Sequence, residues 1–416
     1  MATGRAGFVR QVIFMELTIA EQVLLATFVV TVILGAVANK TNFCTMGAVS
    51  DAVNIGDSGR MRAWVFAMAI AMTGVLVLEA ALGSSLNNTL PPYRTASFAW
   101  LRYIVGGLLF GIGMTLGSGC GNKTLIRLGG GNLKSIFMLL VIGFFAYLMT
   151  KTDFYGIVFY PWVKATTVDL VQYGIAYQDL GAIIAAKVSP VDIASIRLIT
   201  GGVVALMLFW FVFRSKDFRE SSDNILGGAV VGLVVVAGWY ITAGPTGRAW
   251  IDEAEWLDER PINVAVQSFT FINPMGETLS YAADGFNPML LSFGVVALAG
   301  VIIGSFLYAV LTRNFRIEWF SSVRDFVTHM VGATLMGIGG VLAMGCTIGQ
   351  GITGVSTLSL GSVLAFGSIV LGSALTMKFE YYKLLYEADA TFGKVLVTSL
   401  VDLHLLPSGM RKLEAL

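Results

Sequence analysis

Three cysteines are the residues of this chain best suited to chemistry at a defined site. Cys44, Cys120 and Cys346 are widely spaced, and each lies in a polar, glycine-rich segment rather than in an apolar run. An odd number of widely spaced cysteines does not indicate a disulfide framework. With two histidines and no CxxC or HExxH motif, the sequence does not indicate a metal site, and we expect no cofactor. Free thiols are weak hydrogen-bond donors and, when ionised, nucleophiles.

Polar side chains flank two of the cysteines and could help to bind an anion. Asn122 and Lys123 follow Cys120, and Gln350 follows Cys346. Because desolvating an anion is costly, an ammonium and amide groups would have to share its charge with the thiols. Simpler readings stand beside this one: Lys123 as a residue of the positive-inside pattern, and the two amides as helix caps. With the three cysteines, these residues form the candidate substrate-binding site.

An internal repeat surrounds two of the cysteines. Residues 105–120 read VGGLLFGIGMTLGSGC and residues 331–346 read VGATLMGIGGVLAMGC, with nine identities in sixteen positions at a fixed offset of 226. Both copies end in Gly-Cys and continue into a polar segment. Gly-rich backbone bends easily, so the cysteine segments are expected to be re-entrant loops that bring Cys120 and Cys346 together.

The amino-acid composition indicates that these loops belong to a membrane protein. Of the 416 residues, 56% are hydrophobic and 13% are charged, and mean hydropathy is +0.77. Soluble domains are about 25% charged. The near balance of 27 basic and 26 acidic residues offers no basic field for nucleic acid, and no GxxxxGK[ST] loop indicates ATP hydrolysis. The chain is therefore predicted to be an all-α polytopic membrane protein.

Nine apolar runs are long enough to cross a bilayer. They lie at about 20–39, 63–83, 98–118, 133–150, 196–213, 225–243, 288–311, 327–345 and 361–377. The repeat copies fall on the third and eighth runs, so an odd number of crossings separates them and they point in opposite directions. This is an inverted repeat, with halves at 20–150 and 288–377, and such repeats are typical of secondary transporters. Glu79, inside the second run, is a candidate for proton coupling or an interfacial residue.

The remaining segments complete a single transporter domain over 1–416. The connections 151–195 and 244–287 are predicted to be extramembrane, and 378–416 to be an amphipathic C-terminal tail. The first, third, fifth and seventh connections each carry three lysines or arginines, whereas the second carries only Arg94 and the eighth none. The positive-inside rule therefore predicts an outside N-terminus and a cytoplasmic C-terminus.

The cysteine segments also resemble a known family. NFCTMGAVSD at 42–51, GSGCGNKTL at 117–125 and MGCTIGQGITG at 344–354 are similar, in this order, to three segments of the YeeE/YedE membrane proteins. The resemblance extends from about residue 20 to 377. It implies an hourglass-shaped helical protein with cysteine loops at its waist, thiosulfate as the transported ion, and successive contacts of thiosulfate with Cys44, Cys120 and Cys346. It also implies a TusA-like cytoplasmic sulfur-carrier protein as partner.

We therefore expect a transporter rather than an enzyme, which takes up thiosulfate across the bacterial inner membrane by relay between thiols. Three alternatives stay open: transport of another sulfur or selenium compound, a membrane sulfurtransferase that forms a cysteine persulfide, and a scaffold for a sulfur carrier. The sulfurtransferase would need a low-pKa nucleophile and an acceptor for the sulfur.

Overall fold

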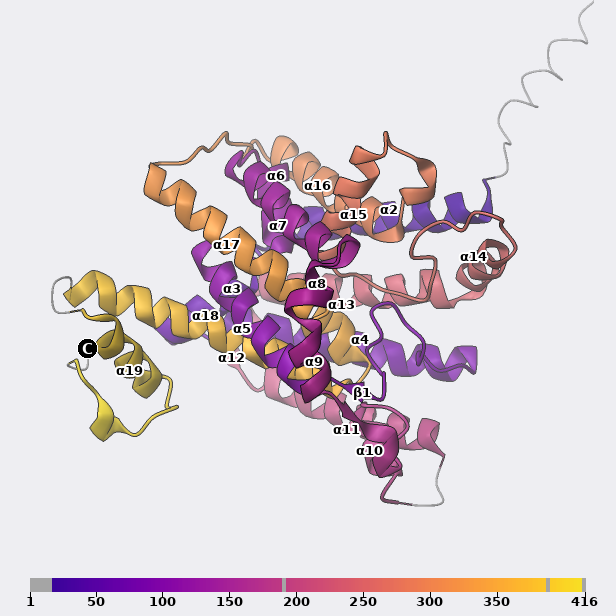
Figure 1. Ribbon diagram of the computed structural model, residues 1–416, viewed down its shortest axis with the longest axis horizontal. Coiled ribbons are helices and arrows are strands. Elements are labelled where there is room, and N and C mark those ends of the chain that lie inside the picture. The colour runs from indigo at the N-terminus through magenta and orange to yellow at the C-terminus, as the bar shows by residue number, and fades with distance from the viewer. Residues whose placement is uncertain (1–16, 189–191, 387–389, 414–416) are drawn as a thin grey trace, which may run out of the picture.

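Nine long apolar helices dominate the computed structural model, which describes residues 17–188, 192–386 and 390–413 (Figure 1). Each of the nine runs predicted from the sequence corresponds to one of them, so the prediction of a polytopic all-α membrane protein is confirmed within the described residues. The long helices are α2 (Ile19–Lys40), α4 (Gly59–Leu82), α5 (Trp100–Leu116), α7 (Lys134–Lys151), α11 (Ile193–Phe213), α13 (Ser222–Ala243), α16 (Phe293–Leu311), α17 (Val323–Leu342) and α18 (Leu360–Tyr386).

Short elements connect these helices. A two-residue antiparallel pair joins β1 (Ser97–Phe98) to β2 (Val168–Asp169), with Ser97 opposite Asp169. The short helices are α3 (Thr45–Ser50), η1 (Asp51–Ile55), α6 (Gly121–Gly129), α8 (Phe154–Val158), α9 (Tyr160–Thr166), η2 (Leu170–Tyr173), α10 (Leu180–Ala185), α12 (Lys216–Glu220), α14 (Pro245–Glu255), α15 (Asn273–Ala283), η3 (Pro288–Leu290), η4 (Gly349–Gly354), α19 (Phe392–Asp402) and η6 (Ser408–Met410).

Side-chain caps fix where several long helices begin. Thr18 and Glu21 form a capping box at α2, in which each side chain bonds to the backbone N–H of the other residue. Asp192, Ser221, Ser292 and Ser322 accept backbone N–H groups at the starts of α11, α13, α16 and α17 in the same way. The first N–H groups of a helix have no partner within it, so these short polar residues set each boundary.

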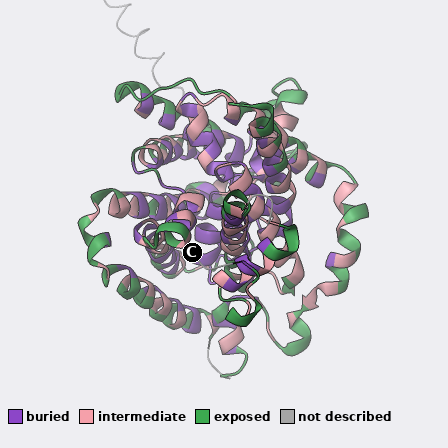
Figure 2. Ribbon diagram, turned by 90° about the vertical axis from the view of Figure 1, so that its left-hand side faces the viewer, coloured by how far each residue is buried: buried purple, intermediate pink, exposed green. Residues whose placement is uncertain are grey.

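Large apolar side chains face outward from the bundle. On α11, Leu206, Met207 and Trp210 are 69%, 61% and 65% exposed, and α7 exposes Leu140 and Phe144. Seen from the left of Figure 1, buried residues gather in the centre of the bundle and exposed ones lie around it (Figure 2). In water such a surface would promote aggregation. Around a set of membrane helices it is the surface that contacts lipid.

The two repeat copies cross at their glycines. A Cβ atom added to Gly113 would lie 2.6 Å from the carbonyl oxygen of Gly332, and one added to Gly332 would lie 2.7 Å from that of Gly113. Further along, a Cβ atom added to Gly339 would lie 2.7 Å from the carbonyl oxygen of Gly106, and one added to Gly106 would lie 2.4 Å from the backbone nitrogen of Ala343. Higher residue numbers on α5 therefore contact lower residue numbers on α17, which means that the two helices run antiparallel. This is the orientation that an inverted repeat requires.

Each of these two helices has a second close neighbour. A Cβ atom on Gly111 of α5 would lie 2.1 Å from the carbonyl oxygen of Ile369 in α18. At the repeat-equivalent position, Gly337 of α17 would lie 2.9 Å from the carbonyl oxygen of Ile142 in α7. Backbone contact of this kind gains dispersion energy where the hydrophobic effect between helices is absent. The helices α18, α5, α17 and α7 are thus closely packed, each against the next.

The structure refines two predicted segments. Residues 378–386, assigned to the amphipathic tail, continue α18, and α19 packs against α18 as a separate helix. Part of the predicted connection 244–287 lies inside the bundle: Phe269, Phe271 and Ile272 are at most 1% exposed, and α15 packs along α7. We call the end of the bundle that holds α3, α12, α19 and residues 312–322 the C-terminal face. It lies to the left in Figure 1.

We expect Gly113→Ala and Gly332→Ala to lower the free energy of unfolding by about 1–3 kcal/mol, because the added methyl group would overlap backbone on the facing helix. Thermal unfolding of the detergent-purified variants measures this.

Gly202→Ala and Gly367→Ala are matched controls, since a Cβ atom at either position meets nothing within 4 Å. These controls should be neutral or stabilising, because alanine favours helix over glycine. Equal losses in all four variants would show that the crossing is not tightly packed.

Candidate functional site

The three cysteines occupy the same kind of backbone turn. Asn42, Ser118 and Met344 have positive φ angles of 50°, 58° and 60°, and each lies two residues before a cysteine. In each turn the N–H of the residue just before the cysteine bonds to a carbonyl five positions back: Phe43 to Ala38, Gly119 to Met114 and Gly345 to Gly340. These are Schellman turns, which end a helix through a residue in the left-handed region.

A new helical turn begins at each cysteine. The carbonyl of Cys44 accepts the N–H of Ala48, that of Cys120 accepts Thr124 and that of Cys346 accepts Gln350, at 3.0, 2.9 and 2.8 Å. The thiols therefore lie between the C-terminus of one helix and the N-terminus of the next. The first N–H groups after a cysteine in this position are not used by the helix, so they can face a ligand.

The structure brings the three thiols into one buried cluster. Cys44, Cys120 and Cys346 are 6%, 2% and 0% exposed, and in the described part of the chain all three are free. Cys44 and Cys346 are both electrostatic neighbours of Cys120, and Lys123 is a neighbour of Cys44 and Cys120. Beyond Cys346 lies Tyr93, whose hydroxyl donates to the Gly349 carbonyl at 2.8 Å. The thiols thus follow one another from the C-terminal face toward the opposite face.

Polar atoms without partners concentrate around these thiols. In the described residues, nine buried side-chain oxygens or nitrogens have no conventional hydrogen-bond partner, and six of them belong to the cysteine segments or to residues 270–273. These six are Thr45 Oγ1, Asn122 Oδ1, Thr270 Oγ1, Asn273 Oδ1, Thr347 Oγ1 and Gln350 Oε1. Two of the six, the hydroxyls of Thr270 and Thr347, contact the thiols of Cys346 and Cys120. A buried polar group without a partner costs about 1–3 kcal/mol. Such a concentration indicates a site that is completed by water or by a polar ligand.

The flanking residues predicted from the sequence lie in this cluster with different partners. Asn122 is 2% exposed, and Gln350 is fully buried and donates through Nε2 to the Ala343 carbonyl at 2.5 Å. Gln350 thereby satisfies the end of α17, which agrees with the capping reading, but its oxygen remains available. Lys123 donates through Nζ to Oδ1 of Asn42, the left-handed residue two positions before Cys44. It therefore links the first two cysteine turns.

Ile272 is a buried residue, beside the second cysteine, that the sequence did not single out. Ile272 precedes the first residue of α15, as Cys44 precedes the first residue of α3. Its side chain packs against Gly121, next to Cys120, and against Gly340 of α17. Ile272 therefore contributes an apolar side chain between the Cys120 turn and α17. No motif marks Ile272, because its place depends on how α15 folds back.

The acidic residue proposed for proton coupling has a structural partner. Glu79 accepts from the fully buried Arg94, and its Oε1 also accepts the N–H of Leu86 at 2.7 Å. Arg94 Nε donates to the Thr357 carbonyl at 3.0 Å, so the pair ties residues 83–99 to the segment that follows Cys346. Breaking a buried pair of this kind leaves an uncompensated charge, so the pair is a structural contact of this part of the bundle.

Glu277 on α15 is a buried carboxylate that sequence reasoning missed. Its Oε1 accepts from Asn263 Nδ2 at 2.7 Å, and its Oε2 accepts from Ser292 Oγ. These two donors satisfy the buried carboxylate and tie α15 to the start of α16.

Known proteins resemble this chain over most of its length. Residues 40–375 match the protein family described as sulphur transport. The chain is 22% identical over 352 residues to the thiosulfate transporter TsuA of Escherichia coli K12, covering 82% of this chain and 90% of that protein. It is 27% identical over 340 residues to the thiosulfate transporter TsuA of Spirochaeta thermophila, covering 82% and 93%.

Two buried threonines of the third cysteine segment test whether the unpartnered groups serve the fold. We expect Thr347→Val to leave thermal stability nearly unchanged, because the lost hydroxyl contacts only the Cys120 thiol among the described residues, and a thiol is a weak hydrogen-bonding group.

Thr353→Val is the matched change, since the Thr353 hydroxyl is equally buried and donates to the Phe269 carbonyl at 2.8 Å. It should lose about 1 kcal/mol of unfolding free energy. If Thr347→Val were the more destabilising of the two in thermal unfolding, the interpretation of Thr347 as a ligand-facing group would be wrong.

Proposed function

Because this chain belongs to the sulphur-transport family of membrane proteins, we propose that it carries thiosulfate across the bilayer along the line of its three thiols. The observation that carries the proposal is the repetition of one turn at Cys44, Cys120 and Cys346, which places three thiols in a single buried cluster. One such turn would be an ordinary helix end. Three such turns whose thiols lie close together are the arrangement expected of a transport path with successive binding sites.

The chemistry of the cluster suits thiosulfate. This anion has two negative charges and a soft terminal sulfur, and neutral thiols are weak donors that contact it without trapping it. Thiolates would repel it. The hydroxyl of Thr45 lacks a partner among the described residues and that of Thr347 contacts only the Cys120 thiol, so both can donate to the anion as it passes.

Charge and backbone share the rest of the desolvation cost. Lys123 lies beside Cys44 and Cys120, where its ammonium offsets part of the anion's charge. Cys120 precedes the nine-residue helix α6, whose first N–H groups and dipole favour an anion. Asn122 and Gln350 add amide groups that can turn either a donor or an acceptor toward the path.

We further propose that the C-terminal face is cytoplasmic, because the connections that gather there are the more basic ones, and that the membrane is the bacterial inner membrane. Thiosulfate then enters from the opposite face, passes Cys346 first, and leaves past Cys44. A small TusA-like sulfur carrier, which the family resemblance implies, would receive sulfur at the C-terminal face.

We expect Cys44→Ala, Cys120→Ala and Cys346→Ala each to lower uptake about tenfold or more, since a hydrogen bond to a charged group contributes roughly 1.5–3 kcal/mol. The measurement is uptake of thiosulfate labelled in its sulfane sulfur by cells without other sulfate or thiosulfate importers.

Ser368→Ala is the matched control, because it also removes one heavy atom from a buried position and its hydroxyl bonds only within α18, to the Leu364 carbonyl. Uptake that survives in all three cysteine variants at equal protein levels would end the relay. Wild type without thiosulfate uptake would favour another sulfur or selenium substrate.

The same preparations separate transport from sulfur transfer. In the sulfurtransferase alternative, a cysteine thiolate attacks the sulfane sulfur, the S–S bond of thiosulfate breaks, and sulfite leaves with the bonding electrons. The protein would then gain one sulfur atom in mass as a persulfide. The transport proposal predicts an unchanged intact mass after exposure to thiosulfate.

A further inference from the structure

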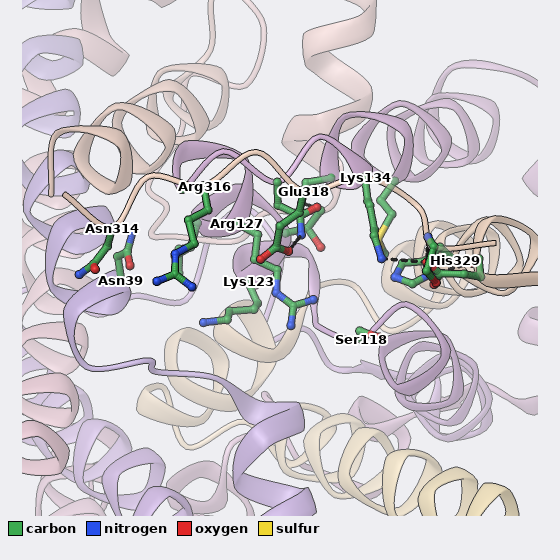
Figure 3. Close-up of a pocket in the computed structure, with 17 residues that line it drawn as sticks. Asn39, Ser118, Lys123, Arg127, Lys134, Asn314, Arg316, Glu318 and His329 are labelled. Carbon is green, nitrogen blue, oxygen red and sulfur yellow. Dashed lines mark hydrogen bonds and ion pairs between the residues drawn. The ribbon is translucent and has the colours of Figure 1, made fainter. Parts of the chain in front are cut away.

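A cavity of about 460 Å³ opens at the C-terminal face beside the Cys120 turn. Its walls come from α6, the start of α7, residues 314–321 and α17 (Figure 3). Ser118 of the Cys120 turn and Lys123 line its inner end, so the cavity adjoins the thiol cluster. We refer to it as the vestibule.

The acidic groups of the vestibule already have partners. Asp325 pairs with Lys134 at 2.8 Å and with His329 at 2.9 Å. Glu318 accepts a hydrogen bond from the side-chain amide of Asn132. Asp325 is therefore neutralised, whereas Glu318 keeps its charge, because an amide donor is neutral. Four cations line the same cavity as these two carboxylates: Lys123, Arg127, Lys134 and Arg316.

Three cations of the vestibule are not neutralised. Lys123, Arg127 and Arg316 form no ion pair with any described residue, and neither arginine side chain makes a hydrogen bond to one. Figure 3 shows their side chains reaching into the same space from α6 and from the loop that carries Arg316. The vestibule therefore has an excess of positive charge.

This placement is unfavourable unless an anion is present. Lys123 and Arg127 are four residues apart on α6, so their side chains are neighbours and repel each other. Arg127 also approaches the Cys120 turn, with its Nη1 3.7 Å from where a Cβ atom of Gly119 would lie. In a partly enclosed space, water screens such repulsion less than at an open surface.

We propose that the vestibule is an anion site that binds a small divalent sulfur oxyanion of the sulfate and thiosulfate class. Arg127 and Arg316 supply forked guanidinium donors that suit tetrahedral oxyanions, and Lys123 supplies a point charge toward the thiols. The cavity has room for the anion with part of its hydration shell. This inference rests on the proposed function, and it adds a station between the thiols and the C-terminal face.

The test is binding of ³⁵S-sulfate to the purified full-length protein at low ionic strength, measured by equilibrium dialysis. We expect Arg127→Gln and Arg316→Gln each to weaken binding about tenfold. Arg324→Gln is the matched control, because Arg324 is an exposed arginine near the start of α17 that does not line the vestibule. It should bind sulfate as the wild type does. Equal affinity in all four proteins, or no saturable binding by wild type, would overturn the proposal.

Thermal stability distinguishes a binding role from a structural one. Without sulfate, both vestibule variants should be at least as stable as wild type, because each substitution removes like-charge repulsion. Added sulfate should raise the melting temperature of wild type and of Arg324→Gln more than that of the vestibule variants. Vestibule variants that are less stable than wild type without sulfate, and equally stabilised by it, would mean that these arginines serve the fold.

The sulfate-binding test can fail or succeed independently of the thiosulfate-uptake test. Sulfate binding in a protein that takes up no thiosulfate would contradict the proposed function alone. Normal thiosulfate uptake together with absent vestibule binding would contradict this inference alone.

Discussion

The antiparallel crossing of α5 and α17 through paired glycines is the constraint on which the rest of the structure depends. Gly106, Gly113, Gly332 and Gly339 have no side chains, so the backbones of α5 and α17 come into direct contact at these positions. Helices that meet this closely end at fixed positions relative to each other. Because a cysteine turn follows each helix, the crossing sets how far apart Cys120 and Cys346 can be. The packing of α18 on α5 and of α7 on α17 holds this pair from both sides.

The turns at the ends of these helices convert packing into a site. A Schellman turn stops a helix and sets the direction of the next residue, so the same turn at three places presents three thiols in equivalent ways. The surrounding hydroxyls and amides are buried without partners, which weakens the fold locally. Tight packing between glycines elsewhere in the bundle offsets that loss. Stability is thus concentrated in the crossing, and polar groups are left available where an anion would pass.

Much of this architecture was predictable from local sequence. Nine apolar runs gave nine helices, and the terminal Gly-Cys of the repeat marked two of the three turns. The third turn carries no matching sequence, because a left-handed residue can be Asn42 as well as Ser118 or Met344, and only the backbone reveals the equivalence. Glu79 illustrates another limit: its pairing with Arg94 depends on how residues 83–99 fold back over the bundle. The burial of Ile272 and the gathering of Arg316 with Lys123 likewise depend on long-range chain paths that no local pattern records.

The central claim is that thiosulfate occupies the space between the three thiols. Anomalous diffraction from crystals of the full-length protein soaked in selenosulfate, which carries selenium in place of the terminal sulfur, would locate the anion directly. The account predicts a selenium peak in contact with the thiols of Cys120 and Cys346 or of Cys120 and Cys44, without a covalent bond to sulfur. An occupied site elsewhere in the bundle with none among the thiols, or a selenium atom bonded to a cysteine after loss of sulfite, would contradict it.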